Sequence, residues 1–382
     1  MKFEDGSFFR FPNTRRSFSN LREILPVRVV PRGGPIYDLP RTENADIDAL
    51  QFIPMNTTAP MTWAQSLEAN YTDGIVVLHQ GCIIYERYPG ALTAAGQHIA
   101  LSVTKSFVAT IAASLISEGA LDENAAVVKY VPELAGSGLA DATIRQLLDM
   151  TTGLRFTEVY AEEESPFWQF CKANGFLPRP PGYTGPETSH AYLRSLEKEY
   201  PHGTKFVYRT VNTDALAWVI AKVMGRSISE VLRDRFWSRL GVEQDAFFTV
   251  DSCGIEFAGA GFNLALRDLA RFGEMIRLGG YYNGQQIVPT NVIEDIRRGG
   301  DREKFAEAGY KTLPGWSYRN MWWVSHNDHG AFTARGIHGQ TIYIDPKAEM
   351  VIARFASHPL AANFNLDPTS LPAYQALANR LI

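Results

Sequence analysis

A serine and a lysine three positions apart, in Ser102-Val103-Thr104-Lys105, could support nucleophilic catalysis. A serine hydroxyl is a weak nucleophile at neutral pH and needs a neighbouring base. Residues 102–118 are predicted to form a helix with very little polar face, and positions i and i+3 of a helix lie on one side, roughly 5–6 Å apart at Cβ. Burial in such a helix favours the neutral lysine amine. We therefore predict Ser102 as the nucleophile and Lys105 as its base.

The four-residue pattern is not specific by itself, because it recurs at Ser195-Leu196-Glu197-Lys198. Charged residues surround that second copy, which is typical of a solvated surface. For Ser102 the alternative is a helix N-cap whose lysine extends its ammonium group to solvent. A lysine within an otherwise apolar helix is costly without a reason, which favours a catalytic role for the first copy.

Tyr208 is the second candidate for chemistry. It comes just before a predicted amphipathic helix at residues 212–224. A phenol near an amine can relay a proton to a leaving group. A core tyrosine with a satisfied hydroxyl would have the same sequence pattern, so both interpretations stay open.

The elements that must position these residues have a clear order along the chain. We expect an irregular wrapping segment at 1–60, a buried β-hairpin at 74–88 and late strands at 316–325 and 341–356, followed by a helix at 372–381. Between them the signals are mainly helical, as at 143–150 and 266–278, with loops rich in Pro and Gly. The predicted fold is α/β, with an antiparallel sheet flanked by helices. Its α/β lobe would take residues 61–119 and 311–382, and an all-helical lobe would take residues 120–310.

Composition narrows the function classes. The net charge of −4 and the absence of a Lys/Arg-rich run argue against nucleic-acid and anionic-membrane partners. Cys82, Cys171 and Cys253 are odd in number and far apart, as expected of reduced thiols. The acidic start has no signal-peptide core, and no run approaches the ~18 apolar residues of a membrane span. We expect a cytoplasmic protein with a small-molecule partner and no cofactor; its oligomeric state stays open, a homodimer included.

Several segments together resemble one family. They are Leu101-Ser-Val-Thr-Lys-Ser, Tyr130-Val-Pro-Glu-Leu-Ala-Gly, Asn212-Thr-Asp-Ala-Leu-Ala-Trp and Gly336-Ile-His-Gly-Gln. With Tyr208, they resemble the serine β-lactamase-like hydrolases, which have the penicillin-binding-protein or transpeptidase fold. Within that family the chain is similar to the nylon-oligomer amidases, or 6-aminohexanoate-dimer hydrolases, and to related esterases, over residues 70–357.

The resemblance implies a role for each matching residue. Ser102 would be the nucleophile, Lys105 the base and Tyr208 the proton relay, and the backbone N–H groups of Ser102 and Ile337 would form the oxyanion hole. The substrate-binding positions it implies are Tyr160, Trp323, Gly336, His338, Cys171 and Gly259. Cys171 replaces an acidic residue that binds the substrate amine in the amidase, and Gly259 replaces another polar contact.

One departure concerns the charge that β-lactam recognition requires. Many relatives have Lys-Thr-Gly on the late strand, and this chain has Ala334-Arg335-Gly336. Whether Arg335 or His338 replaces the missing lysine stays open. We therefore predict a hydrolase that cleaves linear amide or ester bonds through an acyl-enzyme. The alternatives are a β-lactamase, D-amino-acid peptidase or carboxylesterase of the same fold, and a non-catalytic binding module.

Two further groups are set aside. His326 and His329 are not in a helical zinc spacing, and on a strand they would face opposite sides, so no metal site is expected. The run Glu162-Glu163-Glu164 is interpreted as a solvated loop rather than a general acid.

Overall fold

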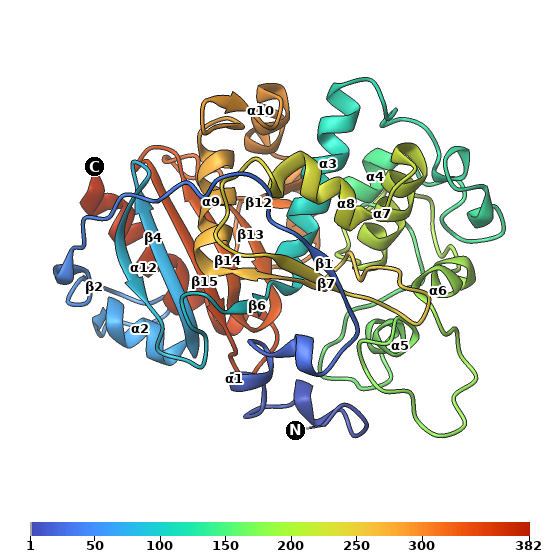
Figure 1. Ribbon diagram of the computed structural model, residues 1–382, viewed down its shortest axis with the longest axis horizontal. Coiled ribbons are helices and arrows are strands. Elements are labelled where there is room, and N and C mark those ends of the chain that lie inside the picture. Colours follow the sequence, from blue (N-terminus) through green and yellow to red (C-terminus); the bar gives the residue numbers. More distant parts are fainter. Residues whose placement is uncertain (1) are drawn as a thin grey trace.

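A seven-stranded antiparallel sheet forms the centre of the computed structural model, which describes residues 2–382 (Figure 1). Two of its strands come from the early hairpin and five from the end of the chain, so the predicted fold class is confirmed. In spatial order the strands are β11 (Ser317–Arg319), β12 (Trp322–Val324), β13 (Phe332–Gly336), β14 (Gln340–Asp345), β15 (Met350–Ala356), β4 (Thr72–His79) and β5 (Cys82–Arg87).

Helices cover both faces of this sheet (Figure 1). Alternate residues of β4 face opposite ways: Val76 and Leu78 belong to the larger core, whereas Ile75 and Val77 belong to a second one. α9 (Leu266–Arg277) packs on β4, β14 and β15, and α12 (Asp367–Leu381) packs with α2 (Trp63–Ala69) over the second core. Both faces are buried, which explains the continuous apolar runs at residues 75–78 of β4 and 350–353 of β15.

The helix predicted at 102–118 begins as a short 3₁₀ turn, Leu101–Val103, and continues as α3 (Thr104–Ser117). It is buried from Thr104 to Leu115 and packs against α7 (Val211–Met224). α8 (Ile228–Leu232) and α10 (Thr290–Arg298) also pack against α3. α4 (Ile144–Leu148) and α6 (Ser189–Ser195) pack on α7, and α5 (Pro166–Ala173) packs on α6.

The structure differs from prediction in two segments expected to lack strands. A second sheet, in the order β1–β7–β8–β6, contains β1 (Val27–Val30), β7 (Ala246–Thr249), β8 (Phe262–Ala265) and β6 (Gln97–Ile99). Residues 120–310 are therefore not all helical, and residues 1–60 are not wholly irregular. β7 and β8 are four residues long and buried at every position, so they show none of the alternation that identifies a strand. The boundaries proposed for the two lobes remain a prediction.

Short elements complete the chain, and none of the helices in residues 2–382 is long and apolar enough to cross a membrane. These elements are α1 (Thr14–Ser17), β2 (Gln51–Phe52), β3 (Met61–Thr62), β9 (Tyr281–Tyr282), β10 (Gln285–Gln286), α10 (Thr290–Arg298) and α11 (Arg302–Glu307).

Candidate active site

The predicted nucleophile and base lie side by side at the start of α3. Lys105 Nζ is 2.9 Å from Ser102 Oγ and 2.7 Å from the carbonyl oxygen of Gly259. Lys105 is only 1% exposed, so its amine is removed from water and directed at the serine. This geometry matches the requirement for a serine activated by an adjacent amine.

Gly259 holds the lysine through its backbone. A Cβ at this position would lie 2.3 Å from Cγ2 of Thr210 and 2.7 Å from Oδ2 of Asp214, so no side chain fits there. Its N–H donates to Oδ1 of Asp214 at 3.3 Å, while its carbonyl faces Lys105. The structure thus gives Gly259 a contact with the base.

Burial lowers the pKa of Lys105 from its usual 10.5, and the carboxylates of Glu158 and Asp214 oppose that fall. Glu158 accepts hydrogen bonds from the Tyr160 hydroxyl, at 2.9 Å, and from the backbone N–H of Thr210. Sequence reasoning did not find Glu158. In the sequence, Glu158 is a single carboxylate two residues before Tyr160. The nearby run Glu162-Glu163-Glu164 is the stronger acidic pattern in this segment, so Glu158 does not stand out.

Tyr208 lies close to this pair. Lys105 Nζ is 5.1 Å from the centre of its ring, and the ring stacks on Trp323 at 5.7 Å. Burial raises the pKa of Tyr208 well above 10, and its contact with Ser102 opposes this rise. Its hydroxyl is therefore protonated at neutral pH and can donate a proton.

The backbone beside Ser102 is closely packed against the end of β13. A Cβ on Gly336 would lie 2.8 Å from the Ala100 carbonyl oxygen and 3.0 Å from the Ser102 nitrogen, so a glycine is required. Leu101 and His338 have φ values of +44° and +61°, in the left-handed region. Such strain persists only where the surroundings hold it, and it is common at active sites.

A small cavity of about 120 Å³ opens over Ser102, and we name it the inner pocket. It is lined by Ser102, Tyr160, Tyr208, Tyr310, Thr312, Leu313, Trp323, Arg335, Ile337, Ala362, Asn363, Phe364 and Asp367. The sequence analysis placed five of these at the site: Ser102, Tyr208, Ile337, Tyr160 and Trp323. Asp367 of α12, Tyr310 of the segment between α11 and β11, and the residues contributed by the segment between β15 and α12 were not identified from the sequence.

The guanidinium of Arg335 is already paired within the inner pocket. It donates to the carboxylate of Asp367, and it lies 5.3 Å from the centre of the Trp323 ring. Asp367 also accepts a hydrogen bond from Thr312 Oγ1 at 2.6 Å. The positive charge of Arg335 is therefore balanced.

His338 and Cys171 lie outside the inner pocket. His338 Nδ1 is 2.7 Å from the carbonyl oxygen of His358, and burial lowers the pKa of His338 to about 4, so the ring is neutral near pH 7. It supplies no charge that could replace the missing lysine. Cys171 is 1% exposed on α5, and burial raises the pKa of its thiol.

The residues set aside from sequence lie elsewhere. Ser195 Oγ donates to the Tyr192 carbonyl, and Lys198 pairs with Asp141. His326 contacts Ser317 and His329 contacts Asp345, and no cluster of metal-binding side chains occurs among residues 2–382. Glu163 and Glu164 have side chains more than four-fifths exposed.

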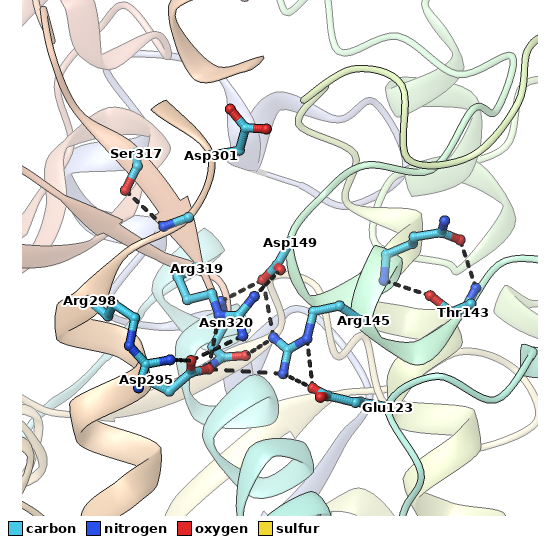
Figure 2. Close-up of polar contacts among 12 residues, drawn as sticks. Glu123, Thr143, Arg145, Asp149, Asp295, Arg298, Asp301, Ser317, Arg319 and Asn320 are labelled. Atoms are coloured by element: carbon cyan, nitrogen blue, oxygen red, sulfur yellow. Dashed lines mark hydrogen bonds and ion pairs between the residues drawn. The ribbon is translucent and has the colours of Figure 1, made fainter. Parts of the chain in front are cut away.

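A polar network fixes the β11–β12 hairpin, which carries Trp323 (Figure 2). Arg145 of α4 donates to Glu123 at 2.9 Å and to Asn320 in the hairpin turn at 2.6 Å. Arg319 joins Asp149 at 2.7 Å and Asp295 of α10 at 2.9 Å. Helices from two distant parts of the chain thus hold one wall of the inner pocket.

The fold and this serine–lysine site define a hydrolase of the β-lactamase class. The family model described as Beta-lactamase matches residues 65–369, and the chain belongs to that family. It is 33% identical to 6-aminohexanoate-dimer hydrolase of Paenarthrobacter ureafaciens over 349 residues, which is 91% of this chain and 86% of the relative.

Solved structures with the same fold support this family assignment. One from Bacillus anthracis, assigned as a 6-aminohexanoate-dimer hydrolase, superposes with a TM-score of 0.91 and 31% identity over 99% of this chain and 97% of its own. A family VIII carboxylesterase superposes with a TM-score of 0.61 and 18% identity over 84% of this chain and 96% of its own, which shows a shared fold.

Proposed function

We propose that this protein is a serine hydrolase that cleaves linear amide or ester bonds through an acyl-enzyme on Ser102. The observation that supports this most directly is the buried Lys105 amine, 2.9 Å from the hydroxyl of Ser102, which lines the inner pocket. The similarity to an enzyme named for a linear amide dimer supports the same substrate class.

The mechanism needs three steps from this chain's own residues. Ser102 Oγ attacks the carbonyl carbon while its proton passes to the neutral Lys105 amine. The oxyanion would be stabilised by the backbone N–H groups of Ser102 and Ile337, which the close approach of Gly336 to Ser102 brings near each other. Tyr208 donates its proton to the leaving amine or alcohol and regains one from the Lys105 ammonium group. Water then attacks the acyl ester and gives a proton to Lys105, which returns it to Ser102 Oγ as the acid is released.

A linear substrate fits the inner pocket better than a β-lactam. Recognition of a β-lactam carboxylate calls for a free cation near the nucleophile. Arg335 is the cation in the inner pocket, and Asp367 already pairs with it. This favours substrates whose reacting end is uncharged.

The proposal is tested by intact-mass detection of an acyl adduct with a panel of p-nitrophenyl esters, linear amides and nitrocefin. We expect an adduct on Ser102 with esters and amides, and turnover reduced by at least 10³-fold in Ser102→Ala. Ser195→Ala is the matched control, because it removes the other Ser-x-x-Lys serine. Full turnover by Ser102→Ala, or rapid nitrocefin hydrolysis without linear-substrate turnover, would contradict the proposal.

A further inference from the structure

A larger groove continues from the inner pocket to the surface, and we name it the outer groove. Its volume is about 950 Å³, in the range of cavities that bind small organic ligands. Tyr160, Tyr208 and Tyr310 line both cavities, so the groove starts at the reacting atoms. A substrate bound over Ser102 therefore has room to extend one arm along it.

Exposed apolar side chains gather around this groove. Among residues 2–382, eleven large hydrophobic residues are exposed, and four of them line the outer groove: Phe11, Val159, Leu360 and Phe364. Leu360 and Phe364 are 56% and 64% exposed. A fifth, Tyr71, contacts Phe11 with ring centres 5.4 Å apart. Scattered exposed hydrophobics need no explanation, but a group along one groove marks a site that binds apolar groups.

The outer groove has almost no free charge. Arg10 and Glu158 are its charged residues, and His338 is neutral because burial lowers its pKa to about 4. Arg10 stands at the rim, with its side chain 70% exposed and 3.9 Å from Glu163. Glu158 is engaged by Tyr160 and Thr210. A charged substrate arm would therefore find no unpaired partner inside the groove, whereas an uncharged hydrocarbon arm would cover the exposed side chains.

We propose that the outer groove binds a long, uncharged, apolar arm of the substrate, which makes extended alkyl esters or amides the preferred substrates. The inference rests on the proposed function for the reaction at Ser102, and on the groove alone for the choice of substrate. Phe11 comes from the N-terminal segment and Leu360 from the segment after β15, so the two ends of the chain shape this preference together.

The kinetic test measures kcat/KM for two ester series. One extends the acyl chain from two to twelve carbons with a fixed leaving group, and the other extends the alcohol chain with a fixed acetyl group. We expect kcat/KM to rise about twofold per methylene in one series, which is half, in free energy, of what full burial gives. Flat profiles in both series would overturn the inference.

Paired leucine variants separate the groove from general effects on the fold. Leu360→Ser should flatten the dependence on chain length, and Leu360→Ser with Val159→Ser should flatten it further. Leu278→Ser is the matched control, since Leu278 is 43% exposed and lies outside both cavities. An unchanged slope in the double variant, or an equal loss of slope in the control, would contradict the assignment.

A binding measurement distinguishes failure of this inference from failure of the proposed function. The Ser102→Ala protein is titrated with N-alkylacetamides, which lengthen the leaving-group arm, and with N-methyl alkanamides, which lengthen the acyl arm. We expect the dissociation constant to fall about twofold per methylene in the series that corresponds to the responsive ester series. Chain-dependent binding without acylation of the natural serine would contradict the proposed function and support the groove. Acylation without chain-dependent binding would do the reverse.

Discussion

Lys105 lies between two opposing influences, because burial favours its neutral form and two buried carboxylates favour its charged form. Only the neutral amine can accept the proton of Ser102, so kcat/KM should rise with pH as Lys105 loses its proton. Since burial lowers its pKa, this rise should lie below pH 10.5.

Replacing Glu158 should move that pH dependence. Glu158→Gln removes the carboxylate that most strongly raises the pKa of Lys105 and keeps an oxygen that can accept from Tyr160. We expect the rising limb of kcat/KM to shift to lower pH, measured with an ester that does not titrate. Glu197→Gln, an exposed carboxylate paired with Arg155, serves as control. A limb that stays in place or moves upward would exclude this role of Glu158.

His338 provides a prediction about stability rather than rate. Its pKa in the fold is about 4, below its ordinary 6.5, so the neutral ring is the form that the fold favours. The fold's preference for the neutral ring lowers the free energy of unfolding in acid, because the unfolded chain takes up the proton first. The free energy of unfolding is unaffected by this above pH 6.5 and falls as the pH falls towards 4. The loss amounts to at most about 3 kcal/mol.

His338→Asn should reduce that sensitivity to acid. Asparagine tolerates the φ of +61° and retains a donor for the His358 carbonyl. Urea unfolding at pH 7.5 and pH 4.5 should show a smaller loss of unfolding free energy in the variant. Histidines elsewhere contribute equally to both proteins and cancel in the difference. Equal losses would show that His338 is not the group responsible.

At the scale of elements, the sequence predicts helices most accurately where one apolar or amphipathic pattern continues for several helical turns. α3, α7 and α9 were found within a few residues, because their apolar or amphipathic patterns persist over a dozen positions. The region predicted as one strand at 316–325 is two strands, with a turn at Asn320 and Met321 in the left-handed region. Asn320 suits a turn, but Met321 does not and neither residue is a glycine, so the turn signal within this apolar stretch was weak.

The polar network around Arg145 holds the turn at Asn320 in place (Figure 2). Breaking this network should therefore lower the stability of the fold. Arg145→Met leaves Glu123 without its ion-pair partner, whereas Asp149 keeps its pair with Arg319, so the free energy of unfolding should fall by about 2 kcal/mol. Arg155→Met breaks an exposed pair with Glu197 and should cost less than about 1 kcal/mol. Urea unfolding measures both, and similar losses would show that the network adds nothing beyond a surface ion pair.

At the scale of the whole molecule, the site contains residues from segments that are far apart in the chain. The sequence alone does not show that these segments are neighbours in the fold. Ser102, Lys105 and Tyr208 could be predicted because each lies in or beside a long helix and carries a recognisable motif. Asp367 and Tyr310 could not, since neither carries a motif, and their place at the inner pocket depends on how α12 and the segment between α11 and β11 pack. Arg335 was identified as a charge, but its partner 32 residues later was not.

The pairing of Arg335 with Asp367 of α12 leads to a final prediction, which concerns the charge of the preferred substrate. Asp367→Asn keeps an oxygen that can accept from Thr312 but leaves the charge of Arg335 uncompensated in the inner pocket. Substrates with a carboxylate on the arm that enters this pocket should then gain about tenfold in kcat/KM relative to their uncharged amides, which is the low end of a charged hydrogen bond. Matched carboxylate and amide pairs measure the ratio in the wild type and the variant. Asp141→Asn, which removes an exposed carboxylate paired with Lys198, should leave the ratio unchanged. If Asp367→Asn also leaves it unchanged, then α12 supports the pocket mechanically and the ion pair does not set the charge of the substrate.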